Sequence, residues 1–250
     1  YAQLVVRAWG EGDESWLVDR KIIYGDQTQP ELWRQVLDAL NQDYPVVGGG
    51  TLRPYAAAVD SGDGETTHYV YAFARNNRTR HIIATKGQSI AGKALLGKPT
   101  RQDVNFKKQV IKKGVDLWPV GSDTGKAIVH ARLKLDGERG PGVMHWPLGL
   151  TDDYWKQLTS ERQVTKLVNG FPKRVWVKKD SDYNEDLDCE VLALAALEYV
   201  KTRHNRKTMY TQFADAIRVE KEREVEKRPA PPKPAAYRVG GRSNFVNSWG

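Results

Sequence analysis

Two acidic segments that lie far apart in the sequence contain residue types suited to metal-dependent hydrolysis. In Val59-Asp60-Ser61-Gly62, a small apolar run ends at a carboxylate and a glycine turn. In residues 184–190, an acid-rich stretch that includes Asp188 leads directly into an apolar helical segment. Carboxylates bind Mg²⁺ and Mn²⁺, and two such ions about 4 Å apart support phosphodiester hydrolysis. We therefore predict that Asp60 and Asp188 are catalytic metal ligands.

A two-metal site needs more than two protein carboxylates. Within the sequence the candidate for a third metal ligand is Asp123, in the segment Gly121-Ser-Asp-Thr-Gly-Lys126. The other candidate is an acid upstream of Tyr1. The chain opens with strand-like residues and without methionine, so we expect it to be part of a longer protein.

Each acidic segment also has a purely structural interpretation. Asp60 can accept hydrogen bonds within the turn formed by Ser61 and Gly62. Asp182 and Glu185 have the spacing of a capping box, and acids in a first turn interact favourably with the helix dipole. The residues alone leave both interpretations open.

The basic balance of the chain favours a polyanionic partner. The net charge is +8 over 250 residues, and a positive field of this kind attracts phosphates. Basic residues are concentrated in 86–114, which we expect to be a loop, and in 162–179, which we expect to be a hairpin turning at Asn169-Gly170. The predicted DNA-binding residues are Lys86, Lys107, Lys108, Lys166, Lys173, Arg174 and Lys178.

Several other chemistries are disfavoured. The single cysteine, Cys189, excludes an intramolecular disulfide and a two-cysteine zinc knuckle. Two patterns resembling phosphate loops, at 87–94 and 92–99, lack the Ser or Thr that must follow the lysine. No apolar stretch approaches the roughly 20 residues of a membrane span, so we expect no membrane partner.

Alternating strands and helices are expected to position these residues. The order of hydrophobic periodicities and turn signals predicts an α/β fold with a mixed sheet flanked by helices, a basic β-hairpin and an extended C-terminal tail. The expected strands are 1–9, 15–24, 55–60, 81–85, 116–120 and 142–147, and the expected helices are 30–40, 66–75, 124–135 passing into strand, and 191–200.

Several short segments, in order over about residues 1–200, resemble the nuclease domain of lambda-type phage terminase large subunits. They are Trp9-Gly-Glu-Gly-Asp-Glu-Ser-Trp16 with Asp19 and Ile23-Tyr-Gly-Asp26, Val59-Asp-Ser-Gly62, Lys86-Gly87, Gly121-Ser-Asp-Thr-Gly-Lys126, Gln157-Leu-Thr159, and Asn184-Glu-Asp-Leu-Asp-Cys189 followed by Leu192-Ala-Leu-Ala-Ala-Leu197.

This resemblance implies an RNase H-like endonuclease that uses Mg²⁺ or Mn²⁺ to cut concatemeric viral DNA during packaging. Asp60 falls on the family's second acid and Asp188 on its third, while the first belongs to a strand preceding Tyr1. The implied organisation is a nuclease domain over 1–207, a charged helix or extension over 208–228, and a proline-rich linker and tail over 229–250.

The resemblance also implies partners. These are double-stranded DNA, the terminase small subunit, an upstream ATPase domain, and the capsid portal, which would be contacted by the tail containing Phe245 and Trp249. Such a phage or prophage protein acts in the host cytoplasm. Two alternatives stay open: another RNase H-like phosphodiesterase, such as a transposase or resolvase, or a catalytically incomplete DNA-binding and capsid-docking module.

Overall fold

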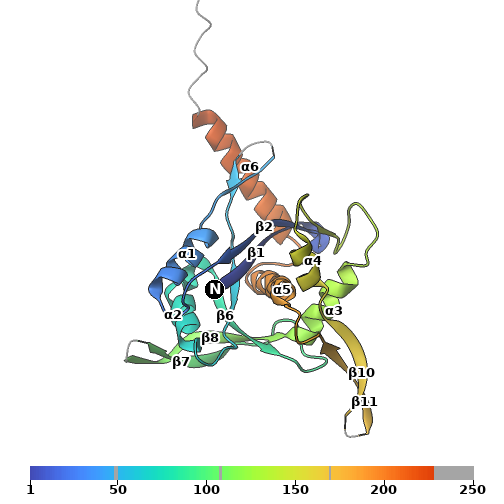
Figure 1. Ribbon diagram of the computed structural model, residues 1–250. Helices are drawn as coiled ribbons and strands as arrows, with labels where there is room; N and C mark the ends of the chain where they lie inside the picture. Colours follow the sequence, from blue (N-terminus) through green and yellow to red (C-terminus); the bar gives the residue numbers. More distant parts are fainter. Residues whose placement is uncertain (48–49, 107–108, 169, 228–250) are drawn as a thin grey trace, which may run out of the picture.

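The computed structural model describes residues 1–47, 50–106, 109–168 and 170–227 (Figure 1). The predicted DNA contacts Lys107 and Lys108, and the predicted tail with Phe245 and Trp249, lie outside the described residues. The strands are β1 (Ala2–Trp9), β2 (Ser15–Ile23), β3 (Tyr44–Pro45), β4 (Thr51–Leu52), β5 (Ala57–Asp60), β6 (Ile82–Gln88), β7 (Thr100–Phe106), β8 (Gln109–Gly121), β9 (Met144–His145), β10 (Arg162–Val168) and β11 (Phe171–Val177). The helices are α1 (Pro30–Leu40), α2 (Thr67–Asn76), α3 (Ser122–Arg132), α4 (Asp152–Leu158), α5 (Glu185–Arg203) and α6 (Met209–Lys227), with short 3₁₀ turns at Glu11–Asp13 and Arg78–Arg80.

The central sheet has the strand order β5-β6-β8-β7. Strands β5, β6 and β8 are parallel, and β7 pairs antiparallel to β8. A second sheet has the order β1-β2-β9, and two separate hairpins are formed by β3-β4 and β10-β11. The predicted α/β class is confirmed, with the first hairpin, β1-β2, outside the central sheet.

Two segments differ from the sequence prediction. Residues 86–114 were expected to form a loop but contribute to β6, β7 and β8. This segment is rich in lysine and glycine, but it has one apolar face, on which Val104 and Val115 are buried beneath α2. One buried face is enough to stabilise an antiparallel pair. The expected strand at the end of 124–135 is absent from that described segment, because α3 ends at Arg132 and the chain turns.

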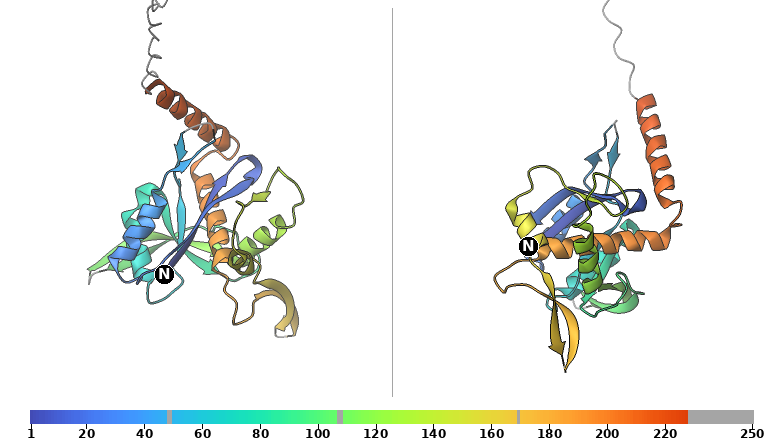
Figure 2. Two further views of the ribbon diagram at one scale, coloured as in Figure 1. Left: turned by 45° about the horizontal axis from the view of Figure 1, so that its top comes forward. Right: turned by 90° about the vertical axis from the view of Figure 1, so that its right-hand side faces the viewer.

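Helices cover both faces of the central sheet (Figure 1). On one face, α2 packs against Ala84 and Val115, and α1 packs against α2. On the other face, Val120 packs with residues of α3 and α5, which include Val129 and Val191. Alternate residues of a strand point to opposite faces, so β8 supplies side chains to both layers. Helix α5 also contacts both β1 and β5, and therefore joins the two sheets (Figure 2).

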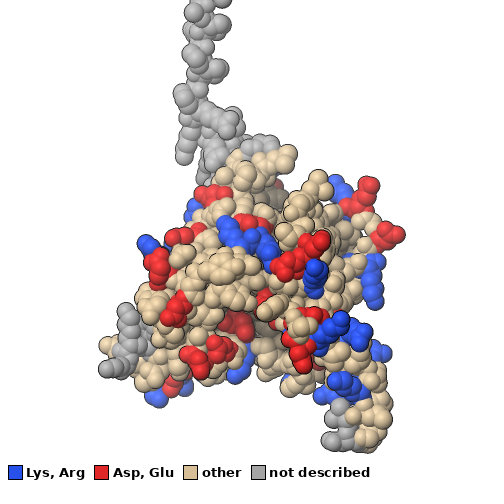
Figure 3. Space-filling model, in the orientation of Figure 1, with Lys and Arg blue, Asp and Glu red and all other residues tan. Residues whose placement is uncertain are grey.

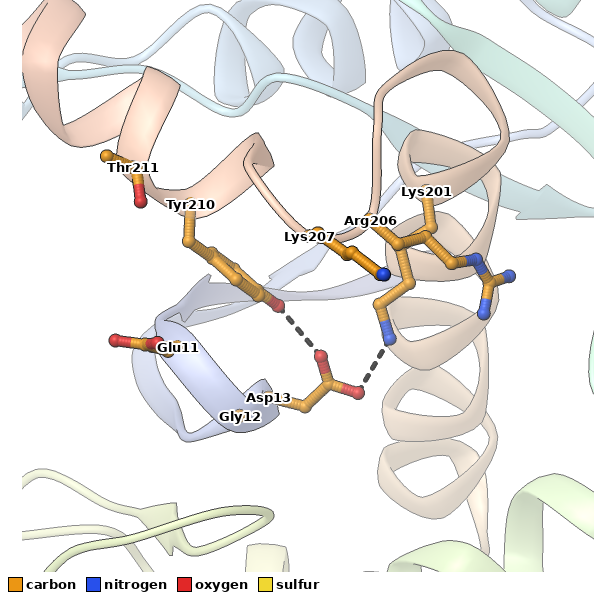
Figure 4. Close-up of a pocket in the computed structure, with 8 residues that line it drawn as sticks. All are labelled: Glu11, Gly12, Asp13, Lys201, Arg206, Lys207, Tyr210 and Thr211. Atoms are coloured by element: carbon orange, nitrogen blue, oxygen red, sulfur yellow. Dashed lines mark hydrogen bonds and ion pairs between the residues drawn. The ribbon is translucent and has the colours of Figure 1, made fainter.

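Helix α6 is fastened to the body of the molecule at its first turn. Met209 is fully buried against the end of α5. The Asp13 carboxylate accepts hydrogen bonds from Lys201 Nζ at 2.6 Å and from the Tyr210 hydroxyl at 2.8 Å (Figure 4). Burial alone would raise the pKa of Asp13, but these two donors outweigh it and lower the pKa. A shallow cavity of about 380 Å³ beside them is lined by Glu11, Gly12, Asp13, Lys201, Arg206, Lys207, Tyr210 and Thr211.

The helices of the described ranges include none that is long and apolar enough to cross a membrane.

Candidate functional site

Asp60 is the last residue of β5, and strand alternation directs its side chain toward α5. Val59 packs with the α2 layer, so its neighbour Asp60 points to the other face. The backbone N–H groups of Gly62 and Ser61 act to lower the pKa of Asp60, and the Ser61 N–H also donates a hydrogen bond to the Thr85 carbonyl oxygen at 2.8 Å. A Cβ at Gly62 would lie 3.0 Å from Asp60 Oδ2, so glycine makes room for the carboxylate. The Asp60 carboxylate thus lies against the turn that follows it, and the residue is exposed.

Asp188 lies in the first turn of α5 with 52% of its side chain exposed. Its Oδ2 accepts a hydrogen bond from Asn184 Nδ2 at 2.8 Å, and its Oδ1 lies 3.6 Å from Lys126 Nζ. The predicted capping box of Asp182 and Glu185 is wrong, because the N-cap residue is Asn184, and the first-turn N–H of Asp186 donates instead to Gln157 Oε1 at 3.2 Å. Asp188 is therefore available to a ligand.

The two predicted carboxylates influence each other electrostatically. Partial desolvation is the largest cause of the raised pKa of Asp188, and the negative charge of Asp60 raises it further, while Lys126 opposes the shift. Partial desolvation likewise raises the pKa of Asp60, and the charge of Lys86 lowers it. Fold topology thus brings two carboxylates from distant segments into one electrostatic environment, and each keeps a solvent-accessible face.

Sequence reasoning missed a third acid near this pair. Glu161 precedes β10 and has only 7% of its side chain exposed. Its Oε1 accepts hydrogen bonds from Lys126 Nζ at 2.6 Å and from Asn184 Nδ2 at 2.8 Å, and its charge raises the pKa of Asp188. In the sequence, Glu161 could have been noticed because it lies two residues after Gln157-Leu-Thr159, one of the segments that resemble the terminase family.

The glycines of the Gly121–Lys126 segment serve close packing. A Cβ at Gly125 would lie 2.5 Å from Cγ1 of Val191 in α5, and a Cβ at Gly121 would lie 2.5 Å from the Ala94 carbonyl oxygen. Real Cβ atoms do not approach so closely, so glycine allows α3 to pack tightly against α5. This close approach places Lys126 between Glu161 and Asp188.

The remaining predicted site residues occupy different positions. Asp123 lies in the first turn of α3, and its charge is not among the named causes of the pKa shifts of Asp60 and Asp188. Lys86 follows Thr85, the register partner of Asp60, and is exposed. Its effect on Asp60 is electrostatic, with no direct ion pair between these two described residues.

Helix α5 is held in place by two buried ion pairs that the sequence analysis did not foresee. Glu190 pairs with Arg7 of β1, and Asp186 pairs with Arg20 of β2. Residues 186 and 190 are one helical turn apart, whereas residue 188 points to the opposite side. The acid-rich segment therefore splits, with two acids facing the β1-β2 hairpin and Asp188 facing the candidate site.

The β10-β11 hairpin presents three of the predicted DNA-binding residues. Lys166, Lys173 and Arg174 are exposed on it. Lys178 follows β11 and donates a hydrogen bond to the Asp182 carbonyl oxygen at 2.7 Å. The hairpin extends away from the body of the molecule, and its basic side chains are visible in Figure 3.

The donor set at the candidate site fits part of a metal shell. Two exposed carboxylates are hard oxygen donors of the kind that Mg²⁺ and Mn²⁺ prefer. No three His, Cys, Asp or Glu side chains in the part of the chain that the structure describes are grouped so that they could hold a metal ion. Asp60 and Asp188 thus supply two ligands, and a complete two-metal site requires at least one more acid.

The fold and the site define an α/β protein that presents a polar site at the carboxyl end of a parallel strand. Residues 2–208 match the family described as the endonuclease domain of the terminase large subunit gpA. The chain belongs to this family.

Two curated relatives support the assignment. The terminase large subunit of Escherichia phage lambda is 34% identical over 203 residues, and that of Enterobacteria phage P21 is 30% identical over 204 residues. Each alignment covers 78% of this chain and 30% of the relative, so the chain spans about a third of the length of these relatives. No solved structure matches this chain.

Proposed function

We propose that this chain is a metal-dependent DNA endonuclease domain of RNase H-like type that cuts concatemeric viral DNA during genome packaging. The observation that supports the proposal is the pair of accessible carboxylates, Asp60 and Asp188, which lie close enough for one charge to shift the pKa of the other. Membership of the terminase endonuclease family supplies the substrate class.

Each group near the site has a role in this proposal. Asp60 and Asp188 hold Mg²⁺ or Mn²⁺, with a further acid from a segment upstream of Tyr1 and with Asp123 as an outer acid. Bound divalent ions would activate water and stabilise the leaving oxygen of the phosphodiester. Lys126 balances the charge of Glu161 and Asp188 before a cation binds.

DNA binding is assigned to the basic residues around the site. Lys86 faces a backbone phosphate, and the hairpin residues Lys166, Lys173 and Arg174, together with Lys178, hold the duplex. The whole protein would add an ATPase domain, contacts with a terminase small subunit, and portal docking through the tail. These partners are proposed from the family alone.

The decisive test uses the full-length large subunit in a plasmid-nicking assay with Mg²⁺ or Mn²⁺. Asp60→Asn and Asp188→Asn should each abolish nicking while leaving the thermal midpoint of unfolding near the parent value. Asp38→Asn, on the exposed side of α1, is the matched control and should cut like the parent. Parent-like cutting by either site variant would remove Asp60 and Asp188 from the proposed site.

A second candidate function is a DNA-binding and capsid-docking module without catalysis. It is favoured by one observation: the described residues provide no three-ligand metal cluster. In that case DNA affinity would fall steeply with salt, whereas calorimetric titration of the full-length protein with Mn²⁺ would show no binding that depends on Asp60 and Asp188.

A further inference from the structure

A buried carboxylate lies close to Asp188. The Glu161 side chain is 7% exposed, whereas 52% of the Asp188 side chain is exposed. Glu161 lies between α4 and β10, and Asp188 lies in the first turn of α5, so the fold brings the two carboxylates together from separate segments. An ionised carboxylate that is buried this deeply is costly unless hydrogen-bond donors surround it. The donors that surround Glu161 therefore indicate its role.

The two donors that satisfy Glu161 also hold Asp188. Lys126 Nζ donates to Glu161 Oε1 at 2.6 Å and lies 3.6 Å from Asp188 Oδ1. Asn184 Nδ2 donates to Glu161 Oε1 and to Asp188 Oδ2, at 2.8 Å in each case. Each oxygen of the Asp188 carboxylate therefore faces a donor that is bonded to the same oxygen of Glu161.

Lys126 is closer to Glu161 than to Asp188, although it lies between them. At 2.6 Å the ammonium group forms a charge-assisted hydrogen bond with Glu161, whereas 3.6 Å from Asp188 Oδ1 is too long for a hydrogen bond. The lysine stem is flexible, so without the charge of Glu161 the ammonium group would move to Asp188. A lysine paired tightly with Asp188 would compete with a divalent cation for the same oxygen.

We propose that Glu161 is a positioning residue for metal binding. It keeps Lys126 from pairing tightly with Asp188 Oδ1 and fixes Asn184 on Asp188 Oδ2, so the carboxylate stays oriented and open to a divalent cation. Replacing a group that holds a metal ligand in place commonly costs about 10–100-fold in metal affinity or activity. This inference rests on the proposed endonuclease function, in which Asp188 binds Mg²⁺ or Mn²⁺. In the competing structural role, Glu161 and Lys126 only fasten α3 to the start of β10.

The experiment titrates Mn²⁺ alone into the full-length large subunit and follows the electron paramagnetic resonance signal of free Mn²⁺. The binding assigned to the site is the part that disappears in Asp188→Asn. Glu161→Gln keeps the size of the side chain and removes its charge, so this part of the Mn²⁺ affinity should fall by about 10–100-fold. The double variant Glu161→Gln with Lys126→Gln should recover most of the loss, because the competing ammonium group is gone.

Two further variants separate positioning from net charge. Glu161→Asp keeps the charge on a side chain that is shorter by one methylene, so its hold on Lys126 is weaker and its Mn²⁺ affinity should lie between those of the parent and Glu161→Gln. Glu198→Gln is the matched control, because Glu198 pairs with Lys201 at 2.9 Å and lies about 15 Å further along α5 than Asp188. It should bind Mn²⁺ like the parent.

Two other measurements separate positioning from a structural role. At saturating Mn²⁺, Glu161→Gln should nick plasmid DNA at close to the parent rate, because enough metal displaces the lysine. A purely structural role would lower the thermal midpoint of unfolding, measured by circular dichroism, without changing the Mn²⁺ affinity of the folded variant.

The outcomes distinguish failure of this inference from failure of the proposed function. Parent-level Mn²⁺ affinity in folded Glu161→Gln or in folded Glu161→Asp overturns the positioning role and leaves the proposed function intact. The inference is also overturned if the double variant binds Mn²⁺ as weakly as Glu161→Gln, since Lys126 would then not be the competitor. If Asp188→Asn binds Mn²⁺ like the parent, the metal site itself is absent and the proposed function fails as well.

Discussion

The substitution Arg7→Met tests the view that buried ion pairs hold α5 against the β1-β2 hairpin. The Arg7 and Glu190 side chains are 0% and 1% exposed, and they pair directly. Arg7 Nη1 also donates to Ser15 Oγ at 3.1 Å, and the Tyr154 hydroxyl donates to Glu190 Oε1 at 2.8 Å. After the substitution, Glu190 keeps only the Tyr154 hydrogen bond, and its carboxylate stays buried without a countercharge.

The magnitude follows from that uncompensated charge. Removing one partner of a buried pair costs about 3–5 kcal/mol. A domain of this size loses roughly 2–4 °C of thermal midpoint for each kcal/mol, so the midpoint should fall by about 6–20 °C. Adding Glu190→Gln should recover part of the loss, because the amide still accepts the hydrogen bond from Tyr154 and carries no charge.

Urea unfolding followed by circular dichroism measures the effect. Arg34→Met is the matched control, since Arg34 and Glu31 form an ion pair with side chains 70% and 58% exposed, and such pairs contribute about 0–1 kcal/mol. If Arg7→Met destabilises the protein no more than Arg34→Met does, the buried pair does not fix α5 and the reasoning fails.

Two further predictions concern the packing around the site. Gly125→Ala should destabilise the protein by about 1–3 kcal/mol, because the new Cβ would clash with Val191 and push α3 away from α5. Gly64→Ala is the control, since a Cβ at Gly64 would lie in open space. Equal thermal midpoints for the two variants would refute the proposed clash. Burial lowers the pKa of His130 below 6.5; the charges of nearby lysines lower it further, and the charge of Glu161 opposes the shift. As the pH falls, His130 is therefore protonated in the unfolded state before it is protonated in the folded state. The free energy of unfolding should decrease as the pH drops below 6.5. His130→Phe should lose that contribution to the pH dependence while still packing on Trp176, and parallel pH profiles of unfolding free energy for parent and variant would contradict the assignment.

Local patterns predicted most elements and the two carboxylates. Asp60 was recognisable because a charged residue closed a small apolar run, and Asp188 because it opened a buried helix. Both features can be recognised from neighbouring residues in the chain, because hydrophobic patterns over short stretches indicate where strands and helices begin and end. In the structure the charge of Asp60 raises the pKa of Asp188, and the assignment of both residues as metal ligands stays a prediction.

Contacts between distant segments were beyond such reasoning. The pairing of Glu190 with Arg7 leaves no local trace, so the sequence analysis treated all acids of 184–190 as one cluster. Glu161 was missed because it lies between α4 and β10, outside any periodic element. The β7-β8 pair was missed because alternation on one buried face was outweighed by its lysines and glycines.

The length of α5 separates the candidate site from the attachment point of α6. Asp188 lies at one end, and Lys201, which bonds to Asp13 at the attachment of α6, lies at the other. At 1.5 Å per residue the two positions are roughly 20 Å apart, about the width of a DNA duplex, and they point to different sides of the rod. A nucleic acid bound at the Asp188 end of α5 would therefore leave the attachment of α6 uncovered.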